Sequence, residues 1–422
     1  IFSSLVVLNK ENKMIDFSDV LKFSSDKISG TEYKNSILKK NILIYMAKFG
    51  EVTIADLARE LNVSVPSVTK LVTELKEDGY LEDNGKIETS GGRRPNVFGL
   101  AADAFYFLGV DVRRRRLDIA LLDFQGNIIE KKEGIPFVLE NTMAAFEQIC
   151  LEINNFIDES SLGKEKIIGV GISLTGRVDS NDGYSYTYFN FNETPLTDLF
   201  EERLGIRSYI ENDSRAMVYA EKIFGVVKEE KNVLFLNLGR GIGVGEMFDG
   251  KLYYGKTGFA GELGHIPLLD NEIICHCGKK GCLETEASGI ALEKMFIEHL
   301  AAGETSVLSE KWKSGEDILL YDIIEAANND DVLSITLIAN IAEKLGRGVG
   351  VLINLLNPDL VVVGGSLSLV GDYLMLPLKM AINKYSLSLV SKDTKFKMSK
   401  LGETASVIGV AMLVRAKILG VI

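Results

Sequence analysis

Three of the four cysteines of this chain lie within eight residues, in the segment ICHCGKKGCLE (274–284). His265 precedes Cys275 by ten residues. One imidazole and three thiolates make the closed tetrahedral set that structural zinc sites use, and clustered cysteines in a chain without an export signal bind metal more often than they form disulfides. The cluster therefore predicts a structural zinc site, and a chance cluster of reduced thiols is the alternative. The expected ligands are His265, Cys275, Cys277 and Cys282.

The remaining cysteine and the histidine inside the cluster are expected to play other parts. His276 stands between two candidate ligands, and consecutive side chains seldom all reach one metal, so His276 is expected to point elsewhere. Cys150 lies among apolar residues at helical spacing, which predicts a place in the core.

Length and charge bound the class of protein. The 422 residues suggest two to four domains, and 47 basic against 59 acidic side chains give a net charge of −12. This balance argues against a surface that coats nucleic acid or anionic lipid. The excess of acidic side chains lies outside residues 31–100, which hold ten basic and ten acidic side chains. No apolar run approaches the ~18 residues of a spanning helix and no signal peptide is visible, so we expect a cytoplasmic protein without membrane contact.

A helix-turn-helix pattern follows an N-terminal arm (1–32). Apolar residues recur at helical spacing from Tyr33 to Met46, in TIADLARELNV (53–63), and from Val68 to Leu75. Ser64 is placed to cap the third helix, whose first turn contains Pro66. Short helices joined by a tight turn are typical of DNA-binding modules, and a helical protein-interaction module is the alternative.

A β-wing is expected directly after the third helix, because Asn84-Gly85 is a strong hairpin-turn signal. The segment SGGRRP (90–95) then presents two guanidinium groups. The whole pattern predicts a winged helix-turn-helix over residues 33–100. The candidate DNA-binding residues are polar or basic side chains able to reach base edges or phosphates, namely Ser64, Ser67, Thr69, Lys70, Arg93 and Arg94.

The sequence changes to an α/β texture from Phe105 onward. Apolar, β-rich runs are punctuated by Gly and Asp, and the pattern repeats from Val233 with VLFLNLGRGIGVGEMF. Long helices are expected at about 287–301 and 332–356, with a closing helix after Thr404. Two strand-turn-strand units that each open on a glycine-rich turn predict two similar lobes around a cleft.

The run from Gly258 to Glu284, GFAGELGH through CHCGKKGCLE, resembles the signature around the zinc site of the ROK family of bacterial sugar kinases and sugar-responsive repressors. The resemblance covers nearly all of residues 35–422 and points to the transcriptional-regulator branch with an N-terminal winged helix-turn-helix. It implies an α/β, actin/hexokinase-like (ribonuclease H-like) two-lobed sugar-binding body. Lobe 1 would span 101–212, completed by the C-terminal helix (about 403–422), and lobe 2 with the zinc site would span 213–402.

The resemblance also implies the sugar-binding residues. Asn212 and Asp213, in YIENDSRA, match the family's sugar-binding pair, in which the Asp is the general base of the kinases. Glu262 and His265 match the sugar contacts of the ExGH motif, and Glu284 matches the acidic residue that ends the zinc loop. Carboxylates and an amide supply paired acceptors and donors for vicinal hydroxyls. Helix capping is the alternative for Asn212 and Glu284.

The chain departs from the kinases at both phosphate loops. The family's first loop follows an Asp with two glycines and a Thr, whereas Asp111-Val112 is followed here by four arginines, Arg113–Arg116. The second loop has Arg240 where a small hydroxyl residue is usual. Bulky side chains then stand where backbone N–H groups would approach the phosphates. We therefore expect no catalytic residues, with Asp213 a vestigial general base, and the four arginines in a basic surface or in salt bridges.

The sequence predicts a sugar-responsive DNA-binding regulator, most simply a repressor of carbohydrate metabolism genes and not an enzyme. Its expected partners are operator DNA, a sugar or sugar-phosphate effector in the cleft between the lobes, and a second copy of the chain in a homodimer, with a tetramer as the larger option. The main alternative is an ATP-dependent sugar kinase, with a glucose-like or N-acetylglucosamine-like substrate and a fused DNA-binding domain. A repressor controlled by a partner protein is the other.

Overall fold

The computed structural model describes residues 30–86, 95–191 and 193–422. Most of the predicted N-terminal arm and both candidate arginines, Arg93 and Arg94, lie outside the described residues. The chain divides into two compact units. Unit 1 holds the described residues up to Gly176 together with Asp182–Glu211 and Val410–Ile422, and unit 2 holds Arg177–Asn181 and Asn212–Gly409.

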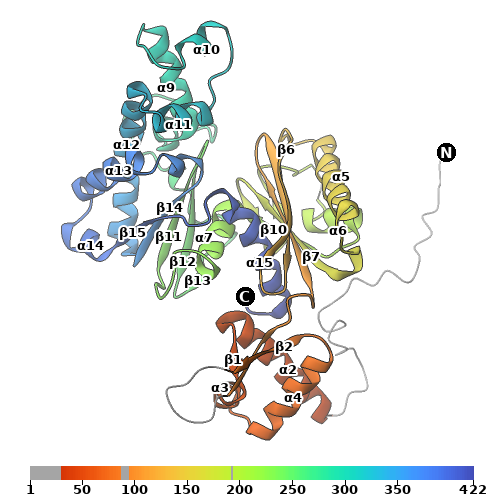
Figure 1. Ribbon diagram of the computed structural model, residues 1–422. Coiled ribbons are helices and arrows are strands. Elements are labelled where there is room, and N and C mark those ends of the chain that lie inside the picture. The colour runs from red at the N-terminus through yellow and green to blue at the C-terminus, as the bar shows by residue number, and fades with distance from the viewer. Residues whose placement is uncertain (1–29, 87–94, 192) are drawn as a thin grey trace, which may run out of the picture. The chain divides into compact units, whose positions relative to one another are not determined.

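The N-terminal part of unit 1 is a winged helix, as the sequence predicts. Its elements are α2 (Gly30–Phe49), β1 (Val52–Thr53), α3 (Ile54–Glu60), α4 (Val65–Glu77), β2 (Leu81–Lys86) and β3 (Asn96–Leu100). The strands form one sheet in the order β1-β3-β2. The apolar positions at helical spacing are buried, among them Ile42, Leu57, Val68 and Leu75. Helices α2 and α3 both pack against α4, and Figure 1 shows the three helices together with the short sheet.

The predicted hairpin turn at Asn84-Gly85 is wrong. Strand β2 continues through both residues to Lys86, which pairs with Asn96, and the register shifts between Asp83 and Lys86. Gly85 has a φ of +87°, and the Asn84 amide donates to the Glu51 carboxylate. The left-handed preference of Asn-Gly therefore serves an irregularity within the strand. The connection between β2 and β3 falls in residues 87–94, outside the described part of the chain.

The rest of unit 1 is built on a five-stranded sheet in the order β10-β7-β4-β5-β6. Its strands are β4 (Tyr106–Val112), β5 (Arg116–Asp123), β6 (Ile128–Pro136), β7 (Ile167–Leu174) and β10 (Ser208–Asn212). Strands β4, β5 and β6 pair antiparallel, and β7 joins β4 in parallel. The accompanying short elements and helices are α5 (Met143–Glu159), η1 (Lys164–Lys166), β8 (Val178–Asp179, in unit 2), β9 (Tyr184–Ser185) and α6 (Leu196–Leu204).

The closing helix α15 (Ala405–Leu419) is present after Thr404, as predicted. Its second half lies against β7, where Gly171 allows a very close approach. A Cβ on Gly171 would stand 2.7 Å from the Val410 carbonyl oxygen. Glycine at this point of the strand is thus required by the approach of another backbone.

Unit 2 repeats the strand arrangement of unit 1. Its sheet has the order β13-β12-β11-β14-β15, with β11 (Val233–Leu238), β12 (Ile242–Phe248), β13 (Lys251–Leu252), β14 (Leu360–Gly364) and β15 (Lys395–Met398). Strands β11, β12 and β13 pair antiparallel, while β14 and β15 extend the sheet in parallel. Each unit thus has an antiparallel meander whose first strand also pairs in parallel, β4 with β7 and β11 with β14, which confirms the α/β fold with two similar sheets.

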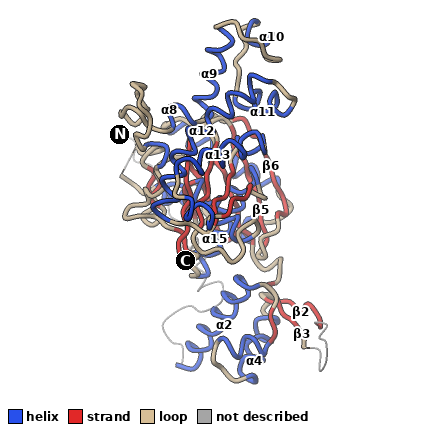
Figure 2. The backbone as a smooth tube through the Cα atoms, turned by 90° about the vertical axis from the view of Figure 1, so that its left-hand side faces the viewer, coloured by secondary structure: helices blue, strands red, loops and turns tan. Residues whose placement is uncertain are grey.

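Helices cover both faces of the unit 2 sheet. Helix α7 (Asp213–Ile223) packs on β11 and β12, while the other face carries a large apolar core shared with α9, α11, α12 and α13. Figure 2 shows α12 and α13 side by side, as their extensive packing requires. The remaining elements are η2 (Leu263–His265), α8 (Glu284–Ala287), α9 (Gly289–Ala301), α10 (Ser309–Lys313), α11 (Leu320–Asn328), α12 (Val332–Leu356), η3 (Ser366–Val370), α13 (Asp372–Tyr385), α14 (Ser388–Asp393) and η4 (Gly402–Thr404).

Among the helices that the structure describes, none is long and apolar enough to cross a membrane.

Candidate functional site

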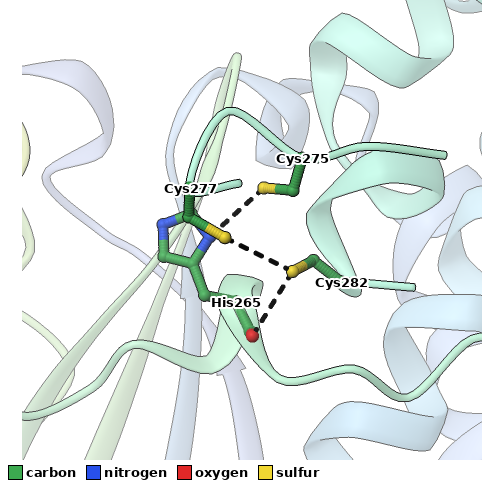
Figure 3. A group of neighbouring side chains, drawn as sticks. All are labelled: His265, Cys275, Cys277 and Cys282. Carbon is green, nitrogen blue, oxygen red and sulfur yellow. Dashed lines mark hydrogen bonds between the residues drawn. The ribbon is translucent and has the colours of Figure 1, made fainter. Parts of the chain in front are cut away.

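The four predicted zinc ligands lie together in unit 2. Ligand atoms of His265, Cys275, Cys277 and Cys282 all stand within 4.8 Å of one another (Figure 3). The Cys277 and Cys282 sulfur atoms are 3.6 Å apart, and the Cys275 sulfur is 3.5 Å from His265 Nδ1. A tetrahedral zinc with Zn–S bonds of about 2.3 Å spaces its ligand atoms by about 3.8 Å. A disulfide, at about 2.05 Å, is ruled out by the Cys277–Cys282 separation.

The loop folds so that its thiols face one point. Gly278 and Gly281 both have positive φ, and the Cys275 N–H donates to the Lys279 carbonyl oxygen, which turns the chain sharply between the second and third cysteines. Burial raises the pKa of the Cys282 thiol to about 12, while the Lys279 N–H lowers the pKa of Cys277. Zinc binding requires the thiolate form of each cysteine, so the affinity of this site for the metal would depend on pH.

His265 faces two groups at once. Its Nδ1 points toward the cysteine cluster, and its Nε2 lies 3.6 Å from a carboxylate oxygen of Glu262. A metal-bound imidazole usually makes such an outer contact to a carboxylate, which fixes the ring. His265 therefore links the cysteine cluster to Glu262, the neighbouring candidate for sugar binding.

His276 lies outside the four-ligand group. Its largely exposed ring packs edge-on against His265, and its Nδ1 is 3.3 Å from Glu284. His265, His276 and Glu284 form a second group of possible metal ligands, but its oxygen and nitrogen set lacks the buried thiols of the first.

Asn212 and Asp213 stand at the start of α7. Asn212 is its N-cap, since the side-chain oxygen accepts from the backbone N–H groups of Ser214 and Arg215 at 3.0 and 3.2 Å. The capping alternative for Asn212 is thus realised. Asp213 accepts from the Ser214 N–H and hydroxyl. The helix N-terminus places both side chains where partial positive charge favours a carboxylate.

Glu284 connects the zinc loop to the second glycine-rich loop. One of its oxygens accepts from the Ile242 N–H at 2.9 Å, and the other lies beside His276. A Cβ on Gly241 would come within 2.7 Å of the Glu284 carboxylate, so the loop is packed directly against it. Contact of Glu284 with a sugar remains a prediction.

The two segments that align with the phosphate loops of the kinases hold arginines in ion pairs. The Arg113 Nε lies 2.7 Å from buried Asp111 and 3.4 Å from Asp118, and the Arg116 Nε lies 3.3 Å from Asp118. In the second loop, Arg240 Nη1 contacts both carboxylate oxygens of Glu293, at 2.8 and 2.9 Å. Salt bridges were one of the two arrangements expected for Arg113–Arg116, and Arg113 and Arg116 form them. Arg114 and Arg115 are exposed. The partners Asp118 and Glu293 carried no signal in the sequence.

The described DNA-binding candidates form one exposed group on α4. Ser64 caps the helix through the Ser67 N–H, and its hydroxyl is 2.8 Å from that of Ser67. Thr69 donates to the Val65 carbonyl oxygen, and Lys70 extends into solvent beside Glu74. The buried side of the same helix packs into the winged-helix core, so its polar side is available for a DNA groove.

An N-terminal winged helix joined to two repeated α/β sheets, with a cysteine-histidine centre beside candidate sugar ligands, defines a class of DNA-reading proteins with a sugar-kinase-like body. Comparison with known proteins agrees. The profile of the ROK family matches residues 107–417, and that of the MarR family matches residues 37–86. The chain therefore belongs to the ROK family.

Named relatives fall on both branches of that family. A xylose repressor of Caldicellulosiruptor bescii is 28% identical over 85% of this chain and 90% of its own length. A glucokinase of Halalkalibacterium halodurans is 31% identical over 74% of this chain and 95% of its own length. A crystal structure of a ROK family transcriptional regulator, a homolog of the E. coli MLC protein, superposes with a TM-score of 0.74 at 26% identity and covers 91% of this chain and 97% of that one.

Proposed function

We propose that this chain is a sugar-responsive transcriptional repressor of carbohydrate metabolism genes. One observation carries the proposal: an exposed, capped recognition helix occurs in the same chain as the group Asn212, Asp213, Glu262 and His265. The relatives that extend over the winged helix as well as the body are regulators. Sugar binding would act by favouring one conformation of the body over another, which changes the affinity for DNA.

The proposal includes a second copy of the chain. A winged helix reads one half-site, and a dimer reads a palindrome with two half-sites one helical turn or more apart. The neutral balance of residues 31–100 against the acidic remainder supports contact with DNA through the winged helix alone.

Zinc would be held by His265, Cys275, Cys277 and Cys282 in a structural role. A bound zinc offsets two of the three thiolate charges and fixes the loop between its ligands. The residues around the zinc would then contact the sugar. Glu262 lies beside the His265 ring, and Glu284 follows the last ligand, Cys282, by two residues.

Loss of kinase activity is the finer part of the proposal. Arg113 is paired with Asp111, the residue after which the kinase loop would begin, and Arg240 is paired with Glu293. Each guanidinium brings bulk where the kinases use glycine and a small hydroxyl residue, and each is neutralised by a carboxylate, so neither loop offers a free backbone cradle for phosphates. The retained Asp213 keeps the kinase as the second candidate.

The deciding experiment measures DNA binding with and without sugars. With a DNA site selected by the protein from a random pool, we expect one of glucose, xylose, N-acetylglucosamine or a 6-phosphate to weaken binding by about tenfold or more. Glu262→Gln should lose this response and keep the DNA affinity, because the effector loses a charged acceptor. Glu272→Gln, on the exposed part of the zinc loop, is the matched control. ATP-dependent phosphorylation of a sugar that disappears in Asp213→Asn would establish the kinase instead.

Replacement of Arg93 and Arg94 by alanine should weaken DNA binding without altering the sugar response. Two lost phosphate contacts would reduce the magnitude of the negative slope of log K against log salt concentration by about 1.8. The measurement is fluorescence anisotropy at several salt concentrations, with Arg59→Ala, an exposed arginine on α3 paired with Asp56, as the control. An unchanged salt slope would remove both arginines from the interface.

A further inference from the structure

A buried arginine stands two residues after Asp213 in the first turn of α7. Arg215 is only 3% exposed. Its Nη1 donates to the Gly258 carbonyl oxygen and its Nη2 to the Val178 carbonyl oxygen, both at 2.7 Å. The guanidinium carbon also lies 5.2 Å from the centre of the Tyr254 ring. A cation that is taken out of water is stabilised here by short charge-assisted hydrogen bonds and by an aromatic face.

These contacts join three segments that are distant in the sequence. One is α7, which begins at the sugar pair Asn212 and Asp213. Another is the loop that starts at Tyr254 and runs through Gly258 to Glu262. The third is Arg177–Asn181, a short stretch of unit 2 whose neighbours in the chain on both sides belong to unit 1.

The loop and the short stretch touch through their backbones. Gly258 has a φ of +79°, and a Cβ there would come within 2.5 Å of the Val178 carbonyl oxygen. The same oxygen accepts from Arg215. One guanidinium therefore binds two backbone carbonyls at the point where the two segments are in closest contact. Without it, both buried carbonyls lose a charged donor, at the free-energy cost of an unmade hydrogen bond.

We infer that Arg215 is the positioning residue of the sugar site: it fixes the loop that carries Glu262 relative to the helix that carries Asn212 and Asp213. The inference rests on the proposed function, since it assigns these residues to a sugar. Arg215 acts through the two carbonyls and not through the ligand. Loss of Arg215 lets the loop with Glu262 shift relative to the helix with Asn212 and Asp213. Sugar affinity depends on both segments holding their positions, because both contact the hydroxyl groups.

The chain offers a matched control in Arg415. That side chain is 5% exposed, and its Nη1 donates to the carbonyl oxygens of Phe124 and Gln125, at 2.8 and 3.2 Å, within unit 1. Arg215 and Arg415 are both buried cations that donate to backbone carbonyl oxygens, and Arg415 Nη2 also donates to the Ala47 carbonyl oxygen, at 3.5 Å. Only Arg215 lies beside the sugar pair.

The test compares Lys and Met variants at both positions in the full-length protein. Calorimetry measures binding of glucose, xylose, N-acetylglucosamine and N-acetylglucosamine 6-phosphate, and thermal unfolding measures stability. Arg215→Met should weaken sugar binding about 100-fold, and Arg215→Lys, which keeps the charge but not the fork, about tenfold. Arg415→Lys and Arg415→Met should lower the unfolding midpoint by a similar amount and leave sugar affinity unchanged. Hydrogen exchange of residues 254–262, measured without sugar, should rise in Arg215→Lys and not in Arg415→Lys.

The outcomes separate the inference from the proposed function. If the wild-type protein binds sugar and the Arg215 variants bind it as tightly as the Arg415 variants, the inference is overturned and the proposed function stands. If the wild-type protein binds none of the sugars but exchange in 254–262 still rises, the proposed function fails and the positioning of the loop by Arg215 stands. If the wild-type protein binds none of the sugars and exchange in 254–262 does not rise, both the inference and the proposed function are overturned.

Discussion

Replacing Cys282 with serine is expected to abolish binding of the proposed zinc and unfold the segment between His265 and Glu284. The Cys282 thiol is fully buried, and its residue forms a backbone bridge with Pro267. A structural zinc supplies as much as about 10–16 kcal/mol to small zinc-binding folds, so loss of one ligand should destabilise this segment by several kcal/mol. The measured zinc content should fall from about one zinc per chain to none, and the sugar response should disappear with the metal.

The control for this substitution is Cys150→Ser. Cys150 is also buried but lies in α5, away from the cluster. It should lose stability through the buried hydroxyl and keep its zinc. A Cys282→Ser protein that retains one zinc per chain, or a metal-free protein that still responds to sugar, would contradict the assignment of the centre.

Gly409→Ala is expected to cause a large loss of stability, because the added methyl group would meet backbone atoms. Gly409 in α15 packs on α7, and a Cβ there would stand 1.9 Å from the Ala216 carbonyl oxygen and 2.5 Å from its carbon. Backbone atoms cannot move aside as a side chain can, so the two helices must separate. We expect a loss of about 3 kcal/mol, even though alanine is the better helix former by about 1 kcal/mol. Because α7 begins at Asp213 and is capped by Asn212, sugar affinity should fall as well.

Guanidinium-induced unfolding of full-length protein measures this loss. Gly239→Ala is the control, because its added Cβ would meet only the Ser366 hydroxyl, at 3.8 Å. Equal midpoints for Gly409→Ala and Gly239→Ala would show that α15 and α7 are not in the contact described.

Local patterns in the sequence predicted local structure well. The helix-turn-helix followed from apolar spacing, and the cap at Ser64 followed from the residue type and the proline behind it. The zinc group followed from ligand chemistry, since three of the four ligands are within eight residues and the chain must bring them together. Such signals depend on a few neighbouring residues.

In the wing, strand pairing overrode the turn preference of Asn84-Gly85. Asn84-Gly85 has the chemistry of a two-residue turn, yet the β2 strand is held by pairing with β3 on both sides of it. The hydrogen bond from Asn84 to Glu51, which is 33 residues earlier in the chain, could not be seen in the turn motif. Tertiary pairing outweighs the local turn preference of Asn-Gly here.

The sequence by itself determined the class of protein: a winged helix, two repeated α/β sheets and a cysteine-histidine centre, because periodicity, caps and ligand spacing act over short stretches of chain. Only the tertiary structure decided which partners the buried and half-buried charges have. Arg240 meets Glu293 across 53 residues, and Arg215 meets Gly258 and Val178 across 43 and 37. A buried guanidinium must find acceptors wherever the packed chain supplies them, and a linear sequence does not record which carbonyl or carboxylate the fold brings near.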